Sequence, residues 1–190
     1  MRAETSTPVN EIIATRRSPR SFNSESVISD VDLLAILEAA RWAPSAFNGQ
    51  PWRYFVGKRG DQVFGEILDS LGEFNQKWAV NASALILVAS KTTKGDGSPH
   101  ADFQYDCGLS VAQLSIEAHD RGLIVHQMTG FDREKASSNV GMSSDLTSVV
   151  VVAVGTQDAP EKLAGPLLDR ELAKRERLPL SEIVLKGLPA

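Results

Sequence analysis

The sequence contains few residues that could crosslink the chain or bind a metal. Cys107 is the single cysteine, so no disulfide can form within the chain. The three histidines, His100, His119 and His126, are not grouped at the spacing of metal ligands. We therefore expect no structural or catalytic metal, and we assign structural roles to the histidines and to Cys107.

Long apolar runs are lacking as well. The longest nearly unbroken run, residues 82–89, is far too short to cross a bilayer. Glu4, Thr5 and Ser6 stand where a secretory signal would need an apolar segment. Hydrophobic residues make up 42% of the chain and charged residues 23%, as in soluble globular proteins. We expect a cytoplasmic protein without a membrane partner.

The 190 residues are enough for one domain of ordinary size. We find no internal repeat and no sign of a second domain, so residues 1–190 are predicted to form a single domain. The net charge of -4 argues against general nucleic-acid binding. Arginines are nevertheless concentrated near the two ends, a pattern that suggests a small anionic ligand. They are Arg16, Arg17 and Arg20, then Arg170, Arg175 and Arg177.

Hydrophobic periodicity predicts helices that alternate with four short apolar strands. Asn10 is expected to cap the first helix, and Ser29 with Asp32 resembles a capping box for the second. Runs of branched residues indicate strands over residues 53–58, 84–90, 123–126 and 147–154. The helices are expected over residues 11–14, 30–43, 61–71, 102–121 and 132–140.

Two of these helices carry residues at helical spacing that mark one face of each helix. The expected faces are Val31, Leu34, Leu37 and Ala40 in one helix, and Leu109, Ala112, Ile116 and His119 in the other. Residues 158–190 then form a polar, proline-bearing tail that is too rich in Leu, Ile and Val to be plainly disordered. We expect this tail to pack on something, with a partner subunit as a candidate.

Two polar segments are candidates for ligand binding. Residues 16–20, RRSPR, bring guanidinium groups, a hydroxyl and backbone N–H groups into one turn, as phosphate binding requires. A solvated basic turn is the alternative. Residues 43–52, APSAFNGQPW, place Ser, Asn and Gln between two prolines, which suits a heteroaromatic ring with mixed donors and acceptors. An ordinary helix-to-strand connection is the alternative here.

Both segments, in this order and at this spacing, resemble the N-terminal signature of the nitroreductase family. The order is RRSxRxF and, about two dozen residues later, APSxxNxQPW. The resemblance continues through Phe74-Asn75, residues 84–90, the sequence MTGFD at 128–132 and the sequence RERLPLSEIV at 175–184. It implies an α+β nitroreductase-like fold, with a mixed central sheet flanked by helices and a C-terminal tail that wraps a dimer partner.

The resemblance also implies a homodimer that binds two FMN molecules at its interface. Arg16, Ser18, Arg175 and Arg177 would hold the phosphate, with Arg17 close to it, and Arg20 would lie near the pyrimidine edge of the flavin. Asn75 would contact the ring or ribityl chain, and the backbone around Thr129 and Gly130 would face the flavin N5. The full implied cofactor-binding set is Arg16, Arg17, Ser18, Arg20, Pro44, Ser45, Asn48, Gln50, Asn75, Met128, Thr129, Gly130, Arg175 and Arg177.

The reaction implied by the resemblance is hydride transfer from NADH or NADPH through the flavin to a nitroaromatic, quinone or related acceptor, with ping-pong kinetics. No catalytic acid or base is assigned, and Arg20 is the electrostatic candidate. Other family reactions remain open, namely enal or semialdehyde reduction, dehalogenation and oxygen-dependent flavin chemistry. A non-enzymatic protein that stores or senses FMN is a further alternative.

The sequence departs from relatives at two places. Some relatives have a lysine a few residues after the asparagine that matches Asn75, whereas this chain has Trp78 with Lys77 beside it. Larger relatives carry helices over the substrate channel, where this chain has only residues 91–100. The second difference favours an open pocket.

Overall fold

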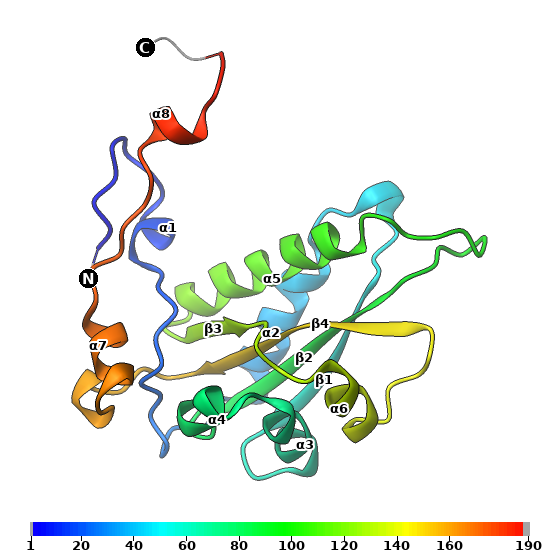
Figure 1. Ribbon diagram of the computed structural model, residues 1–190, viewed down its shortest axis with the longest axis horizontal. Coiled ribbons are helices and arrows are strands. Elements are labelled where there is room, and N and C mark those ends of the chain that lie inside the picture. Colours follow the sequence, from blue (N-terminus) through cyan, green and yellow to red (C-terminus); the bar gives the residue numbers. More distant parts are fainter. Residues whose placement is uncertain (1, 188–190) are drawn as a thin grey trace.

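A four-stranded sheet runs through the middle of the protein, and helices cover both of its faces (Figure 1). This computed structural model describes residues 2–187. The strands are β1 (Trp52–Lys58), β2 (Ala84–Lys91), β3 (Ile124–Met128) and β4 (Leu146–Gly155). The helices are α1 (Glu11–Thr15), α2 (Asp30–Arg41), α3 (Gln62–Ser70), α4 (Glu73–Ala79), α5 (Phe103–Asp120), α6 (Arg133–Asn139), α7 (Pro166–Leu172) and α8 (Leu180–Ile183), with 3-10 turns η1 (Ala46–Asn48) and η2 (Pro160–Lys162).

The α+β class is confirmed, but the expectation of a mixed sheet is wrong for the four described strands. They lie in the order β1-β2-β4-β3, and all three neighbouring pairs are antiparallel. Lys58 at the end of β1 pairs with Ala84 at the start of β2. The two helices between these strands, α3 and α4, therefore return the chain to the same end of the sheet instead of crossing over it.

The central strand β2 separates two hydrophobic cores. Successive strand side chains point to opposite faces, so Ile86 packs with Ile36 of α2 and other residues of α2 and α5. Leu85 instead belongs to the second core, with Ile67 of α3 and Trp78 of α4. All five side chains are fully buried. Each contributes about 1.5 to 3 kcal/mol of stabilisation by leaving water, which makes the sheet a firm base for the surface segments.

The predicted strands and the first helices are confirmed, with ends that differ by a few residues. The Asn10 side chain accepts from the Ile12 N–H at 2.9 Å, and the Ser29 hydroxyl accepts from the Asp32 N–H at 3.0 Å. Both predicted caps are therefore present. The sequence did not predict α4 or the short helices in the tail.

The faces marked on α2 and α5 are only partly buried: Ala40 is fully buried, and Leu37 and Leu109 pack against the core. Val31 is 72% exposed and Leu34 is 66% exposed, whereas Leu33 and Ile36 are buried. On α5 the buried residues include Cys107, Val111, Leu114 and Ala118, which lie on a different face from the predicted one. These helices are apolar on more than one side, so contact with the sheet decides which face is buried. An apolar strip of α2 is left exposed.

The tail runs beside the N-terminal segment and holds it by backbone contacts (Figure 1). Phe22 forms an isolated bridge with Gln157, and the Asp158 N–H donates to the Ser21 carbonyl at 2.9 Å. Lys174 pairs with Glu4 at 2.9 Å. Beyond this contact the chain extends away from the sheet through α8, with large apolar side chains exposed: Leu178, Leu180, Ile183 and Leu185. Within residues 2–187, no helix combines the length and apolar content that a bilayer crossing requires.

Candidate functional site

An arginine cluster forms where the end of α1 meets the tail. Arg16 follows the last residue of α1, and its Nη1 donates to the Ser18 hydroxyl at 3.4 Å. Arg175 reaches in from the tail and donates to the carbonyls of Arg16 and Ala14. The tail thus brings Arg175, and with it Arg177, to the segment that carries Arg16 and Ser18. Four of the predicted phosphate ligands are together.

This cluster concentrates positive charge. Burial, and then the charge of Arg177, lowers the pKa of Arg16. The pKa of Arg175 is lowered by burial and by the charges of Arg17, Arg16 and Arg177. Within residues 2–187, none of these four guanidinium groups forms a salt bridge with a carboxylate. Guanidinium groups that repel one another without a carboxylate between them are suited to attract an anion.

Glu171 of α7 ties the tail to the arginine segment, a role that the sequence analysis missed. It is 2% exposed, and its Oε2 accepts from the Arg20 N–H at 2.7 Å. Its backbone carbonyl accepts from Arg17 Nη2 at 2.6 Å. Arg17 is therefore engaged with α7. Burial lowers the pKa of Arg20, Glu171 opposes this shift, and Arg170 adds to it.

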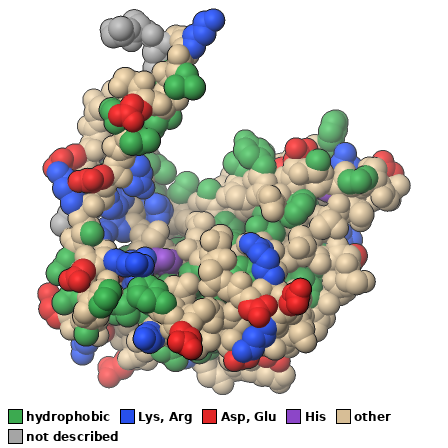
Figure 2. Space-filling model, viewed as in Figure 1, with side chains coloured by type: hydrophobic (Ala, Val, Ile, Leu, Met, Phe, Trp, Pro, Cys, Tyr) green, Lys and Arg blue, Asp and Glu red, His purple; other side chains and the backbone are tan. Residues whose placement is uncertain are grey.

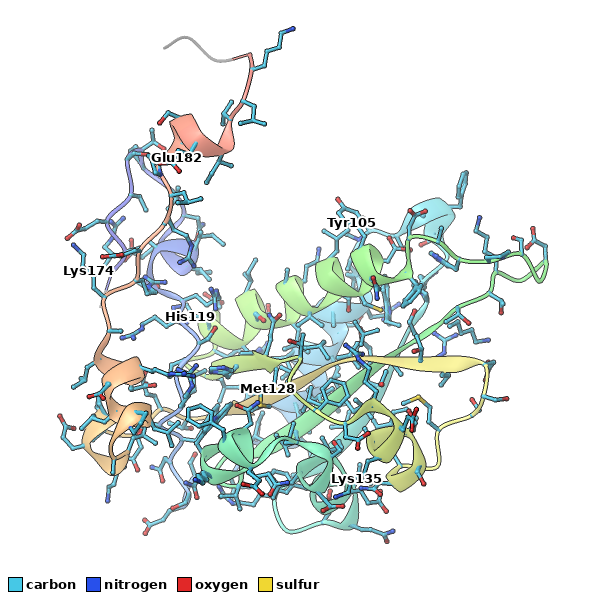
Figure 3. The ribbon with its side chains drawn as sticks, viewed as in Figure 1. Tyr105, His119, Met128, Lys135, Lys174 and Glu182 are labelled. Carbon is cyan, nitrogen blue, oxygen red and sulfur yellow. The ribbon has the colours of Figure 1, made fainter. Side chains whose placement is uncertain are left out.

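The end of β3 meets α4 next to this segment. Met128 is buried as the last residue of β3, and Thr129 and Gly130 after it are exposed. Asn75 of α4 donates from Nδ2 to the Gly130 carbonyl at 3.4 Å. Figure 3 shows Met128 at the end of β3. Four residues predicted to contact the flavin are thus adjacent, and Thr129 and Gly130 among them are exposed.

His126 joins this end of β3 to the arginine segment. Its Nδ1–H donates to the Pro19 carbonyl at 3.0 Å, and its ring lies 4.6 Å from the ring of Trp78. Trp78 also stacks on Phe22 at 5.9 Å. Figure 2 shows a hollow between the tail and the body of the protein, with Lys and Arg side chains along the tail and a histidine at its base. The arginine cluster and the end of β3 are parts of one region.

The loop between α2 and β1 carries Ser45, Asn48 and Gln50, and it lies elsewhere. The Gln50 N–H donates to the Ser45 hydroxyl at 3.0 Å, and Gln50 Nε2 donates to the Asn48 carbonyl at 3.1 Å. Pro44 before it is exposed. In Figure 1 this segment is near the start of α5, across the molecule from α1. One chain therefore does not bring the two parts of the predicted site together.

Known proteins share this sequence pattern and this fold. The model of the nitroreductase family matches residues 13–73. A protein of Archaeoglobus fulgidus with the provisional name NADH dehydrogenase/NAD(P)H nitroreductase is 30% identical over 149 residues, which cover 76% of this chain and 83% of the relative. A solved oxidoreductase containing FMN has 32% identity and a TM-score of 0.92, over 98% of this chain and 95% of the other. This chain belongs to the nitroreductase family.

Proteins with this fold differ in what they bind. A solved iodotyrosine deiodinase, bound to FMN and 3-iodo-L-tyrosine, has a TM-score of 0.62 and 23% identity, over 77% of this chain and 88% of its own. At that identity the likeness shows the fold alone. Membership in the nitroreductase family therefore leaves the acceptor to be argued from the site itself.

Trp78 marks how this nitroreductase-family chain departs from relatives with a lysine near the flavin edge. Its side chain is fully buried in the core beneath the site, between the rings of Phe22 and His126. Lys77 beside it is exposed. Trp78 is thus a core residue, and Asn75 with the Gly130 carbonyl lies at this edge of the candidate site.

Cys107 packs in the hydrophobic core of the chain. It is fully buried in α5, and burial raises the pKa of its thiol, which keeps the sulfur protonated. We expect Cys107→Ser to leave turnover nearly unchanged, because the thiol is neither ionised nor exposed to a ligand. Steady-state rates of the FMN-loaded variant would check this. A large loss of kcat with an intact far-UV spectrum would contradict it.

Proposed function

We propose that this protein is a homodimeric FMN-dependent oxidoreductase that takes electrons from NADH or NADPH. The observation that carries the proposal is the arginine cluster, whose four guanidinium groups lack carboxylate partners within residues 2–187. Such a donor set fits a phosphate monoester, and it lies near the exposed residues Thr129 and Gly130 that follow β3. FMN combines a terminal phosphate, which the arginine cluster would bind, with a flat ring, which the residues after β3 would contact.

Within this proposal, Arg16, Ser18, Arg175 and Arg177 hold the phosphate. Arg16 and Ser18 already face each other at 3.4 Å, so their donors can converge on one group of oxygens. Arg175 lends charge, while its hydrogen bonds to the carbonyls of Ala14 and Arg16 fix its position. Arg17 acts mainly as a tether to α7. Desolvation strengthens the attraction of Arg16 and Arg175 for an anion, because both guanidinium groups are partly buried.

The ring would lie along the end of β3. Asn75 and the backbone of Thr129 and Gly130 offer polar groups at one edge, and Arg20 places a cation beside the other. The Arg20 Nε is buried and lacks a hydrogen-bond partner within the described residues, which leaves a donor for the pyrimidine edge. When bound, FMN supplies two-electron chemistry between a reduced nicotinamide and an acceptor. Arg20 would stabilise negative charge at that edge.

A second copy of the chain would complete the site. Ser45, Asn48 and Gln50 are remote from the arginine cluster within one chain, so they can reach a shared cofactor only from a partner. Exposed apolar side chains supply surface for such a contact. They are Val27, Val31 and Leu34 at α2, and Leu178, Leu180 and Ile183 in the tail. In this arrangement the tail wraps the partner.

The proposed acceptors are nitroaromatics, quinones or related compounds, reduced by a ping-pong mechanism. Residues 92–100 form only a short irregular excursion, with a bridge between Thr93 and Pro99, so no long helix of this segment closes over the site. An open site of this kind favours flat acceptors that stack where the nicotinamide has left. Dehalogenation and FMN storage are the outcomes against which this proposal is tested.

The test is an anaerobic titration of the FMN-loaded protein. We expect the visible flavin band to bleach with NADH or NADPH under nitrogen and to return when a nitroaromatic or quinone is added. Bleaching that only an iodinated or brominated phenol reverses would indicate dehalogenation. A band that persists with both nicotinamides would indicate a binding protein, and failure to bind FMN would remove the proposal.

A further inference from the structure

The loop that carries Ser45, Asn48 and Gln50 has a strained backbone. Phe47, Asn48 and Gln50 have φ values of 51°, 55° and 46°, in the left-handed region that residues with a Cβ rarely adopt. Three such residues within four positions persist only where the surrounding structure fixes them. The contacts that hold this loop therefore decide where its side chains are presented.

A buried acidic residue from α5 provides one of these contacts. Asp106 is 1% exposed, and its Oδ2 and Oδ1 accept from the Ala46 N–H at 3.2 Å and 3.3 Å. Burial of a carboxylate is costly unless it is hydrogen-bonded or paired. Here the carboxylate takes the place of water as the hydrogen-bond acceptor of the Ala46 N–H, at the start of the strained loop.

His100 supports the same carboxylate and also touches the loop. It is 4% exposed, and its Nε2 lies 3.5 Å from Asp106 Oδ2. A Cβ added to Gly49 would stand 3.1 Å from His100 Nε2 and 3.1 Å from the Ala46 carbonyl oxygen. The imidazole is thus packed directly against the backbone of Gly49, and only a glycine fits there without displacement.

We propose that Asp106 and His100 are positioning residues that hold residues 45–50 in the conformation needed to contact FMN bound to the partner subunit. Asp106 fixes the start of the loop through Ala46, and His100 backs its end at Gly49. Both side chains are buried, so they would act on the cofactor only through the loop. This inference rests on the proposed function, because it takes Ser45, Asn48 and Gln50 to be cofactor contacts.

The first test removes the acceptor of the Ala46 amide. Asp106→Ala should weaken FMN binding by about tenfold, because a partly buried N–H loses its partner and the strained loop relaxes. Asp106→Asn keeps an oxygen of similar position and should recover most of the affinity. Hydrogen exchange of the apo protein gives a readout without flavin: the Ala46 amide should exchange faster in Asp106→Ala than in the native chain.

The second test adds a methyl group where Gly49 packs against His100. Gly49 has φ of -68°, so alanine is allowed by the backbone, but its methyl group would press on His100. Gly49→Ala should lower FMN affinity by several-fold while thermal stability changes little. Gly95→Ala is the matched control, because nothing lies within 4 Å of its added Cβ. The control should bind FMN as the native chain does.

The outcomes separate this inference from the proposed function. Native FMN affinity in both Asp106→Ala and Gly49→Ala would overturn it, as would unchanged exchange of the Ala46 amide. A stability loss in Asp106→Ala with normal flavin affinity would make Asp106 a helix-stabilising residue only. If Arg16→Ala still lowers flavin affinity in those cases, the proposed function stands without the positioning role.

Discussion

Replacing Arg16 by alanine is expected to weaken FMN binding by about 2 to 3 kcal/mol, the scale of hydrogen bonds to a charged group. This corresponds to a loss of roughly 30-fold to 150-fold in affinity. The reason lies in the cluster: Arg16 is half-buried, faces the Ser18 hydroxyl and stands next to the charge of Arg177. Alanine removes both the charge and the donors that a phosphate would use.

Fluorescence titration of the apo protein with FMN measures this loss directly. Arg2→Ala is a suitable control, because Arg2 belongs to the same terminal segment but is exposed and paired with Glu11. It should bind FMN with native affinity. Riboflavin, which lacks the phosphate, should bind Arg16→Ala and the native chain equally. Native FMN affinity in Arg16→Ala would contradict the phosphate assignment.

The sequence was most informative where a local rule determines the structure. Asn10 and Ser29 were predicted as helix caps because a short polar side chain can bond to an N–H two or three residues later, and both do so. The strand over β4 was predicted from its run of valines. Neither feature depends on distant parts of the chain, and this is why both could be predicted.

The buried face of a helix and the direction of strand pairing depend on tertiary contacts, and these features could not be predicted from the sequence. On α2, Val31 and Leu34 fit an apolar face as well as Leu33 and Ile36 do, and only the position of the sheet separates the two sets. The mixed sheet that the family resemblance implied was also wrong for the four described strands. A helix between two strands indicates a crossover in many folds, but α3 and α4 turn back beside β1.

The candidate site shows the same division. Arg16, Ser18 and Arg175 were predicted from motifs, and the structure places them together. Glu171 and Asp106 gave no signal, because one buried carboxylate in a helix cannot be told from an exposed one by its neighbours in sequence. Both act through backbone amides more than 50 residues away. Only the folded chain reveals such contacts.

Acidification is expected to destabilise the apo protein between about pH 6.5 and pH 4 through His126. Burial lowers the pKa of His126 to about 4, and the charge of Arg20 adds to the shift against an opposing hydrogen bond to Pro19. An unfolded histidine has a pKa near 6.5, so within this window the unfolded chain binds a proton that the folded chain does not. The contribution of neutral His126 to the free energy of unfolding is fully present above pH 6.5, and about 3 kcal/mol of it is lost as the pH falls to 4.

Urea unfolding at several pH values would measure this slope, and His126→Gln is the informative variant. Glutamine can still donate a hydrogen bond but does not titrate, so the variant should lose most of the pH dependence between pH 4.5 and 6.5. Glu38, whose pKa is lowered from 4.5 to about 2, stabilises the fold throughout this window and loses that effect only as the pH falls below about 4.5. An equal slope in His126→Gln and the native chain would assign the titration to another group.

Because His126 supports both Pro19 and Trp78, loss of its neutral form would also loosen the arginine segment from the end of β3. In the folded chain this protonation occurs only near pH 4, so FMN affinity should hold through most of the window and decline at its acidic end.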